Sequence, residues 1–82
     1  MSNNELLLAK GRLAELHERY SEFEMKAESL LIQLRELLNP LSEFLNLDLE
    51  RVLLLAREFR SLQLNARECQ AMIDKIKETY NL

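Results

Sequence analysis

The chain has 82 residues, enough for one small domain, and a formal net charge of −3. This mild acidity disfavours a dedicated nucleic-acid binder and a protein that binds anionic membrane surfaces, because both functions call for basic surfaces. Apolar residues make up 48% of the chain and charged residues 30%, with one glycine and one proline. This composition excludes intrinsic disorder and is typical of long helices.

The sequence also carries no sign of a targeting or membrane-spanning segment. The first residues lack the basic flank of a secretory signal, and no window approaches the roughly 20 apolar residues that a membrane-spanning helix needs. Cys69 is the only cysteine, so an intrachain disulfide is impossible. We therefore expect no membrane contact and a cytoplasmic location, where thiols stay reduced.

The first predicted element is a helix over residues 3–38. Ser2 is placed to cap it, because its hydroxyl can accept a hydrogen bond from the amide of Glu5. Apolar residues recur in this segment at alternating gaps of three and four, which is the spacing of core positions in a heptad repeat. These seam positions are Leu6, Ala9, Leu13, Leu16, Tyr20, Phe23, Ala27, Leu30, Leu34 and Leu37.

Asn39 and Pro40 interrupt the helix and predict a connector over residues 39–48. Proline lacks an amide donor and disfavours helical backbone at the residue before it. Because Asn39 suits an N-cap and Pro40 suits the first helical position, we expect a short helical turn from Pro40 to about Leu45. An alternative is that Pro40 only kinks one continuous helix, because the apolar spacing continues in phase through Leu41.

A second long helix is predicted over residues 49–79. Asp48 can cap its start, and Lys75 and Lys77 suit the negative end of its dipole. The same alternating gaps of three and four recur here. The seam positions of this helix are Val52, Leu55, Phe59, Leu62, Ala66, Cys69, Ile73, Ile76 and Tyr80.

Two helices of similar length joined by a short connector are expected to lie antiparallel. Folding at the middle of the connector pairs Leu16 with Cys69 and Tyr20 with Ala66, so that large side chains face small ones. A kinked first helix would shift the pairing by one heptad and set two alanines opposite each other. We therefore predict an all-α fold, a long coiled-coil-like antiparallel helical hairpin that forms a single domain over residues 1–82.

Apolar residues crowd the connector end beyond what a two-helix seam can hide. Left bare, they would form a patch larger than monomeric proteins usually expose. We therefore expect either a homodimer, in which two hairpins form a four-helix bundle, or a helical protein partner. The residues predicted to make this contact are Leu31, Leu38, Leu41, Phe44, Leu45, Leu49, Leu53 and Ala56.

The side chains available for catalysis are few. The hairpin register brings His17 near Cys69, which would permit a nucleophilic pair. Cys69 occupies a seam position, however, where cysteine behaves as a small apolar residue. The chain contains no Gly-rich phosphate loop and no Glu-x-x-His motif of the kind that holds metals in helical bundles. We therefore expect no enzymatic activity, no cofactor and no metal.

The sequence thus predicts a protein–protein interaction module that acts through helix packing, as an adaptor, regulator or chaperone-like subunit. The alternative is a nucleic-acid-binding hairpin regulator that uses the outer face of the second helix. There Arg57, Arg60 and Arg67 could contact phosphates. Glu58 and Glu68 dilute this basic patch.

Overall fold

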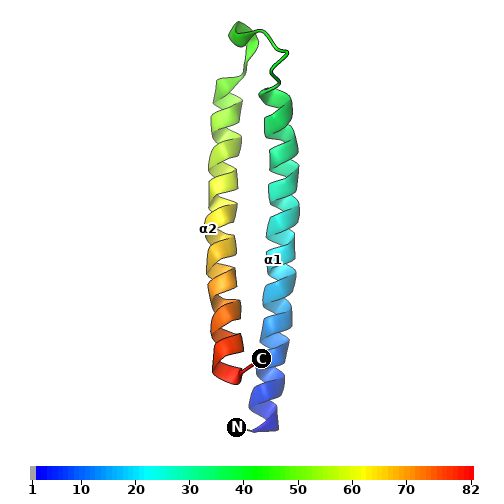
Figure 1. The fold of residues 1–82 in the computed structure, drawn as a ribbon, viewed down its shortest axis with the longest axis vertical. Coiled ribbons are helices and arrows are strands. Elements are labelled where there is room, and N and C mark those ends of the chain that lie inside the picture. The colour runs from blue at the N-terminus through cyan, green and yellow to red at the C-terminus, as the bar shows by residue number, and fades with distance from the viewer. Residues whose placement is uncertain (1) are drawn as a thin grey trace.

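In the computed structural model, which describes residues 2–82, the chain is a two-helix hairpin (Figure 1). Helix α1 spans Asn3–Leu37, the short 3₁₀ helix η1 spans Phe44–Asn46, and helix α2 spans Leu49–Tyr80. The two long helices run antiparallel along a rod of 64 × 15 × 15 Å, with the connector at one end and both chain termini at the other. The predicted all-α hairpin is confirmed.

The starts of both long helices are set by side-chain caps. The Ser2 hydroxyl accepts a hydrogen bond from the amide of Glu5 at 3.2 Å, and the Asp48 carboxylate accepts one from the amide of Arg51 at 3.1 Å. Each cap satisfies an amide that would otherwise lack a partner in the first helical turn. Both predicted caps are therefore confirmed.

The end of α2 is a left-handed cap. Asn81 adopts φ 56° and ψ 45°, a conformation that asparagine tolerates better than most residues. The amide of Leu82 then donates to the carbonyl of Lys77 at 2.9 Å, which satisfies one of the last carbonyls of the helix. With this cap, α2 ends at Tyr80, one residue later than predicted. At the other end of the rod, α1 ends at Leu37, one residue earlier than predicted.

The connector contains the predicted short helical turn, but the turn is η1, which starts at Phe44 and not at Pro40. The Asn39 side-chain oxygen accepts from the amide of Leu41 at 2.9 Å, and the Asn39 carbonyl accepts from the amide of Ser42 at 3.0 Å. Asn39 therefore closes a tight turn instead of capping a helix. The backbone extends at Glu43, and η1 begins only after it. Because α1 ends before the proline, the kinked-helix alternative is also excluded.

The seam between α1 and α2 consists of the predicted residues. Every predicted seam position in both helices is buried or half-buried, and every other position of α1 and α2 is exposed except the half-buried Gln33. The most enclosed part is a cluster of Leu16, Cys69 and Ile73. Leu13, Tyr20, Phe23 and Ile76 pack against this cluster.

One hydrogen bond across the seam fixes the register of the hairpin. The Cys69 thiol donates to the carbonyl of Leu16 at 3.2 Å. These two residues therefore lie at the same height along the rod, as the predicted pairing requires. The register shifted by one heptad is excluded.

Candidate interaction surface

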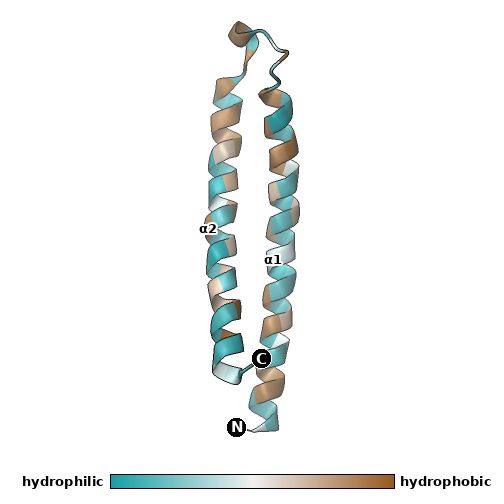
Figure 2. Ribbon diagram, in the orientation of Figure 1, coloured by the Kyte–Doolittle hydropathy of each residue, from teal (hydrophilic) through white to brown (hydrophobic). Residues whose placement is uncertain are grey.

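The candidate site is the group of exposed apolar residues at the end of the rod where the connector lies. Figure 2 shows brown ribbon where both helices approach the connector, and a shorter brown stretch near the start of α1. We call the predicted set the connector-end surface, and the structure leaves all of it exposed. Its residues are Leu31, Leu38, Leu41, Phe44, Leu45, Leu49, Leu53 and Ala56.

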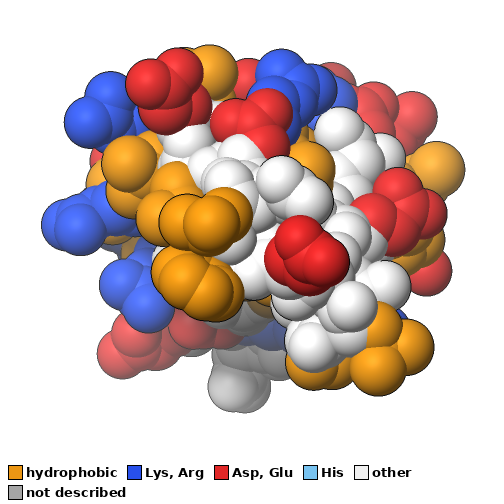
Figure 3. All heavy atoms as spheres, turned by 90° about the horizontal axis from the view of Figure 1, so that it is seen from above, with side chains coloured by type: hydrophobic (Ala, Val, Ile, Leu, Met, Phe, Trp, Pro, Cys, Tyr) orange, Lys and Arg blue, Asp and Glu red, His pale blue; other side chains and the backbone are white. Residues whose placement is uncertain are grey.

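The connector supplies the most exposed side chains of this surface. Leu41 is 91% exposed, and Phe44 and Leu45 are each 80% exposed. The extended backbone at Glu43 and the short η1 hold these residues beyond the ends of α1 and α2, where neither helix can cover them. Viewed onto this end of the rod, a group of apolar side chains lies beside atoms of the backbone and of uncharged polar side chains, with an acidic side chain among them and further charged groups around the rim (Figure 3).

The two long helices supply a continuous apolar strip to the same surface. Leu31 and Leu38 are seven residues apart, so they lie on one face of α1 beside the seam. Leu49 and Ala56 have the same spacing on α2. In an antiparallel pair these positions border the same flank of the hairpin. The connector-end surface therefore runs from the connector onto one flank, which we call the docking flank.

A shallow depression lies within this surface on α1. It is lined by Leu31, Leu34, Arg35, Leu38 and Pro40. Arg35 is absent from the predicted set because it is charged. Pro40 is absent because the sequence predicts it as the first residue of a helical turn. The arginine places a positive charge directly beside the apolar strip.

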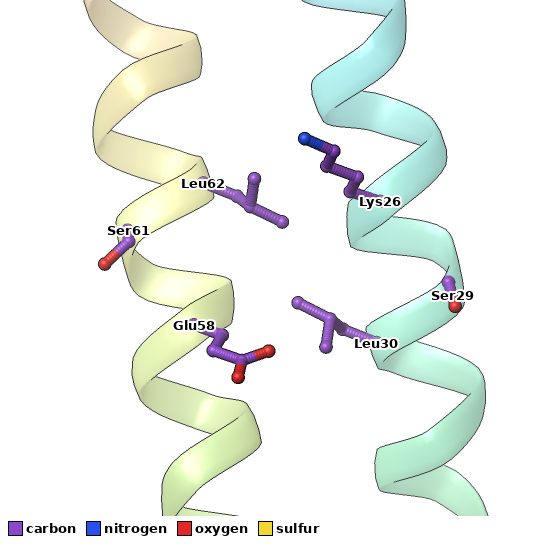
Figure 4. A pocket seen from close by; sticks show the side chains of 6 residues that line it. All are labelled: Lys26, Ser29, Leu30, Glu58, Ser61 and Leu62. Atoms are coloured by element: carbon purple, nitrogen blue, oxygen red, sulfur yellow. The ribbon is translucent and has the colours of Figure 1, made fainter.

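A groove on the opposite flank was not predicted. It has a volume of about 440 Å³ and is lined by Lys26, Ser29, Leu30, Glu58, Ser61 and Leu62 (Figure 4). The signal in the sequence is the pair of small residues, Ser29 and Ser61, each beside a seam leucine, Leu30 or Leu62. Lys26 and Glu58 stand on opposite walls of the groove. Within residues 2–82 the only ion pair joins Arg12 to Glu15, at 3.4 Å.

His17 and Cys69 differ sharply in exposure. Cys69 is buried and donates to the Leu16 carbonyl, whereas His17 is exposed. The structure therefore agrees with the interpretation of Cys69 as a packing residue. Gln70 follows Cys69, so the register of the hairpin places it on the same flank and at nearly the same height as His17. Its side-chain amide donates to Asp74 on its own helix at 2.9 Å.

The three arginines of the predicted nucleic-acid contact are all exposed on α2. Arg60 and Arg67 line one shallow depression together with Gln63 and Leu64, and Arg57 lies outside it. The structure therefore brings together two of the three.

Neither helix in the described part of the chain is long and apolar enough to cross a membrane. Residues 2–82 contain no group of three or more histidine, cysteine, aspartate or glutamate side chains placed to hold a metal ion. No protein-family profile, curated protein sequence or solved structure matches this chain.

Proposed function

We propose that the chain is a small protein–protein interaction module, an adaptor, regulator or chaperone-like subunit, that works by self-association into a homodimer. The observation that supports this proposal is the connector-end surface. Its seven large apolar side chains are each 46–91% exposed. At about 150 Å² for a whole large side chain, which is the low end of the aromatic range, they offer roughly 700 Å². A specific interface buries about 800 Å² on each partner.

The energetics favour covering this surface. Covering apolar surface is favourable in proportion to the area removed from water. Association costs about 4–15 kcal/mol in lost translational and rotational freedom, and the ordering of side chains adds to this cost. An apolar strip on a rigid pair of helices needs little reorganisation before it docks, which keeps the second cost low. We place this activity in the cytoplasm, because the single cysteine does not indicate a disulfide-stabilised protein.

The nucleic-acid alternative gains less support from the arrangement of the arginines. Only Arg60 and Arg67 share a surface depression, and the chain as a whole carries a net charge of −3. Phosphate binding draws its affinity from several clustered cations. Two arginines on an acidic chain are a weaker basis than a continuous apolar surface.

The proposal is tested by the oligomeric state of two matched variants. Leu53 is 58% exposed within the connector-end surface, and its neighbour Leu54 is 53% exposed. Leu54 lies seven residues before Ser61 and so shares the opposite flank of the hairpin. In sedimentation velocity at roughly 10–100 µM, where a dimer with a micromolar Kd is populated, we expect wild type and Leu54→Glu to be dimers. Leu53→Glu buries a charge in the interface and is expected to be a folded monomer.

A wild-type chain that remains a folded monomer across this range contradicts the proposal. So does a Leu53→Glu variant that dimerises as tightly as wild type. Circular dichroism of each variant confirms that the hairpin itself is still helical.

A further inference from the structure

Given the proposed self-association, we infer that the second copy docks in the same direction, so that the two connectors lie at one end of a four-helix bundle. In this arrangement α1 of each copy packs against α2 of the other. The inference comes from the polar residues that continue the docking flank from the connector-end surface toward the chain termini. Glu24 and Glu28 lie on the α1 side of this flank, and Arg60 and Arg67 on the α2 side. All four are exposed.

Two symmetric arrangements can bring the docking flanks of two identical rods together. A two-fold axis along the rod keeps both copies in the same direction and sets α1 beside α2 of the second copy. A two-fold axis across the rod reverses one copy, and sets α1 beside α1 and α2 beside α2. The two arrangements therefore place different side chains opposite each other.

The apolar residues favour the axis along the rod. That axis places the two connectors side by side, so that Leu41, Phe44 and Leu45 of each copy cover those of the other. In a fully overlapping reversed pair, the Leu31 and Leu38 strip would instead face the opposite end of the second copy. There the docking flank carries Lys10, and covering a lysine with leucine is unfavourable.

The charges favour the same arrangement. Leu16 and Cys69 lie at one height, as their hydrogen bond shows. Glu24 is eight residues beyond Leu16 and Arg60 is nine residues before Cys69, so these two residues differ in height by only about 1.5 Å. With the axis along the rod, Glu24 and Glu28 of each copy therefore face Arg60 of the other. Within residues 2–82 none of these three forms an ion pair inside its own chain.

The reversed, fully overlapping arrangement sets Glu28 near Lys10 on α1 but opposes like charges on α2. With full overlap, Arg60 of one α2 lies within about 3 Å in height of Arg67 on the other. This places four arginines in one interface. A reversed pair that overlaps only at the connector ends brings the leucines together, but it sets Arg35 beside Arg35 of the second copy. It also leaves the rest of the docking flank uncovered.

Charge reversal at these positions separates the arrangements by the sign of its effect. With the axis along the rod, Glu24→Arg and Arg60→Glu are each expected to raise the dimer Kd about three- to thirtyfold, since each removes two exposed ion pairs and opposes like charges. The double variant is expected to return to within about threefold of wild type. Arg57→Glu, on the outer face of α2, is the matched control and is expected to leave the Kd unchanged. Tighter dimerisation of Arg60→Glu alone would indicate the reversed, fully overlapping pair and overturn the inference.

Spin-label distances give a second, independent test. In a Cys69→Ala background, single labels are placed at Ser42→Cys in the connector or at Glu18→Cys on the outer face of α1. Same-direction docking predicts both label pairs within about 30 Å, because two hairpins side by side span two to three helix diameters of about 10–12 Å. Full reversed overlap puts the connectors at opposite ends of a 64 Å rod. Overlap at the connector ends separates the Glu18 labels by about 50 Å at 1.5 Å per residue.

A long distance at either position overturns the inference while leaving the dimer itself intact. A monomer at all concentrations is a different result, because it removes the proposed self-association as well. If Cys69→Ala does not fold, the charge-reversal series still decides the orientation, since it retains Cys69.

Discussion

At the scale of single residues, the stability of the hairpin depends on the few side chains that are fully enclosed between the two helices. Ile73 is 1% exposed in the seam, whereas its neighbour Met72 is 47% exposed. Ile73→Ala leaves a cavity beside Leu16 and Cys69 and is expected to lower the free energy of unfolding by about 2–4 kcal/mol. Met72→Ala removes a side chain of similar size that packs less and is expected to cost under about 1 kcal/mol.

Urea denaturation followed by circular dichroism, with both variants at one protein concentration, measures this difference. Equal losses in the two variants would show that the seam is not the core of the folded chain. The pair is well matched because the two positions are adjacent in α2 and both substitutions end in alanine.

The identity of the seam residues could be predicted because spacing alone decides which side of a helix is buried. The half-burial of Gln33 could not be predicted, because Gln33 precedes the seam residue Leu34 and is not itself a seam position. Its side chain folds back onto the carbonyl of Ser29 at 3.4 Å. The groove at Ser29 and Ser61 was missed for a related reason. Heptad spacing predicts which residues point inward, but it does not predict where small neighbouring side chains leave a groove beside them.

At the scale of secondary-structure elements, α2 depends on the cap that starts it. The Asp48 carboxylate accepts the amide of Arg51, whereas Glu43 stands at the equivalent place before η1 without a side-chain hydrogen bond. Asp48→Ala is therefore expected to lower the free energy of unfolding by about 1 kcal/mol, within a range of about 0.5–2. Glu43→Ala is expected to change it by less than about 0.5 kcal/mol.

Thermal or urea unfolding of the two variants checks this prediction. If Glu43→Ala were as destabilising as Asp48→Ala, the loss of a charge in the connector would explain the effect better than the loss of a cap.

The connector is the element that sequence reasoning described least well. Asn39 before Pro40 is compatible with two local structures, a helix N-cap and a side-chain turn, and both use the same asparagine oxygen as an acceptor. The structure adopts the turn, with the Asn39 side chain bound to the amide of Leu41. Local propensity cannot choose between these structures, because the choice depends on how the chain must span from α1 to α2. The connector could thus be located from the sequence, while its conformation required the structure.

At the scale of the whole molecule, a two-helix rod has one seam and no interior enclosed on all sides. Most of its leucines outside the seam lie within a few turns of the connector, where α1, α2 and η1 each contribute some of them. The sequence could predict this excess, because it is a matter of counting apolar positions off the seam. The proposed docking direction rests on the heights of Glu24 and Arg60, which follow from the register of the hairpin. The sequence predicts that register, and the hydrogen bond between Cys69 and Leu16 confirms it.

If the connector-end surface is covered by a second copy, the stability of the fold must depend on the concentration of the chain. Folded dimers gain stability by mass action, whereas the unfolding of a monomer is independent of concentration. For a chain of this size, a tenfold rise in concentration is expected to raise the Tm of wild type by about 3–6 °C. Leu53→Glu is expected to lose this dependence and Leu54→Glu to retain it, when all three are followed by circular dichroism over roughly a hundredfold range of concentration. A Tm of wild type that does not move with concentration would show that the hairpin folds alone and that its apolar end contributes nothing to the stability of the fold.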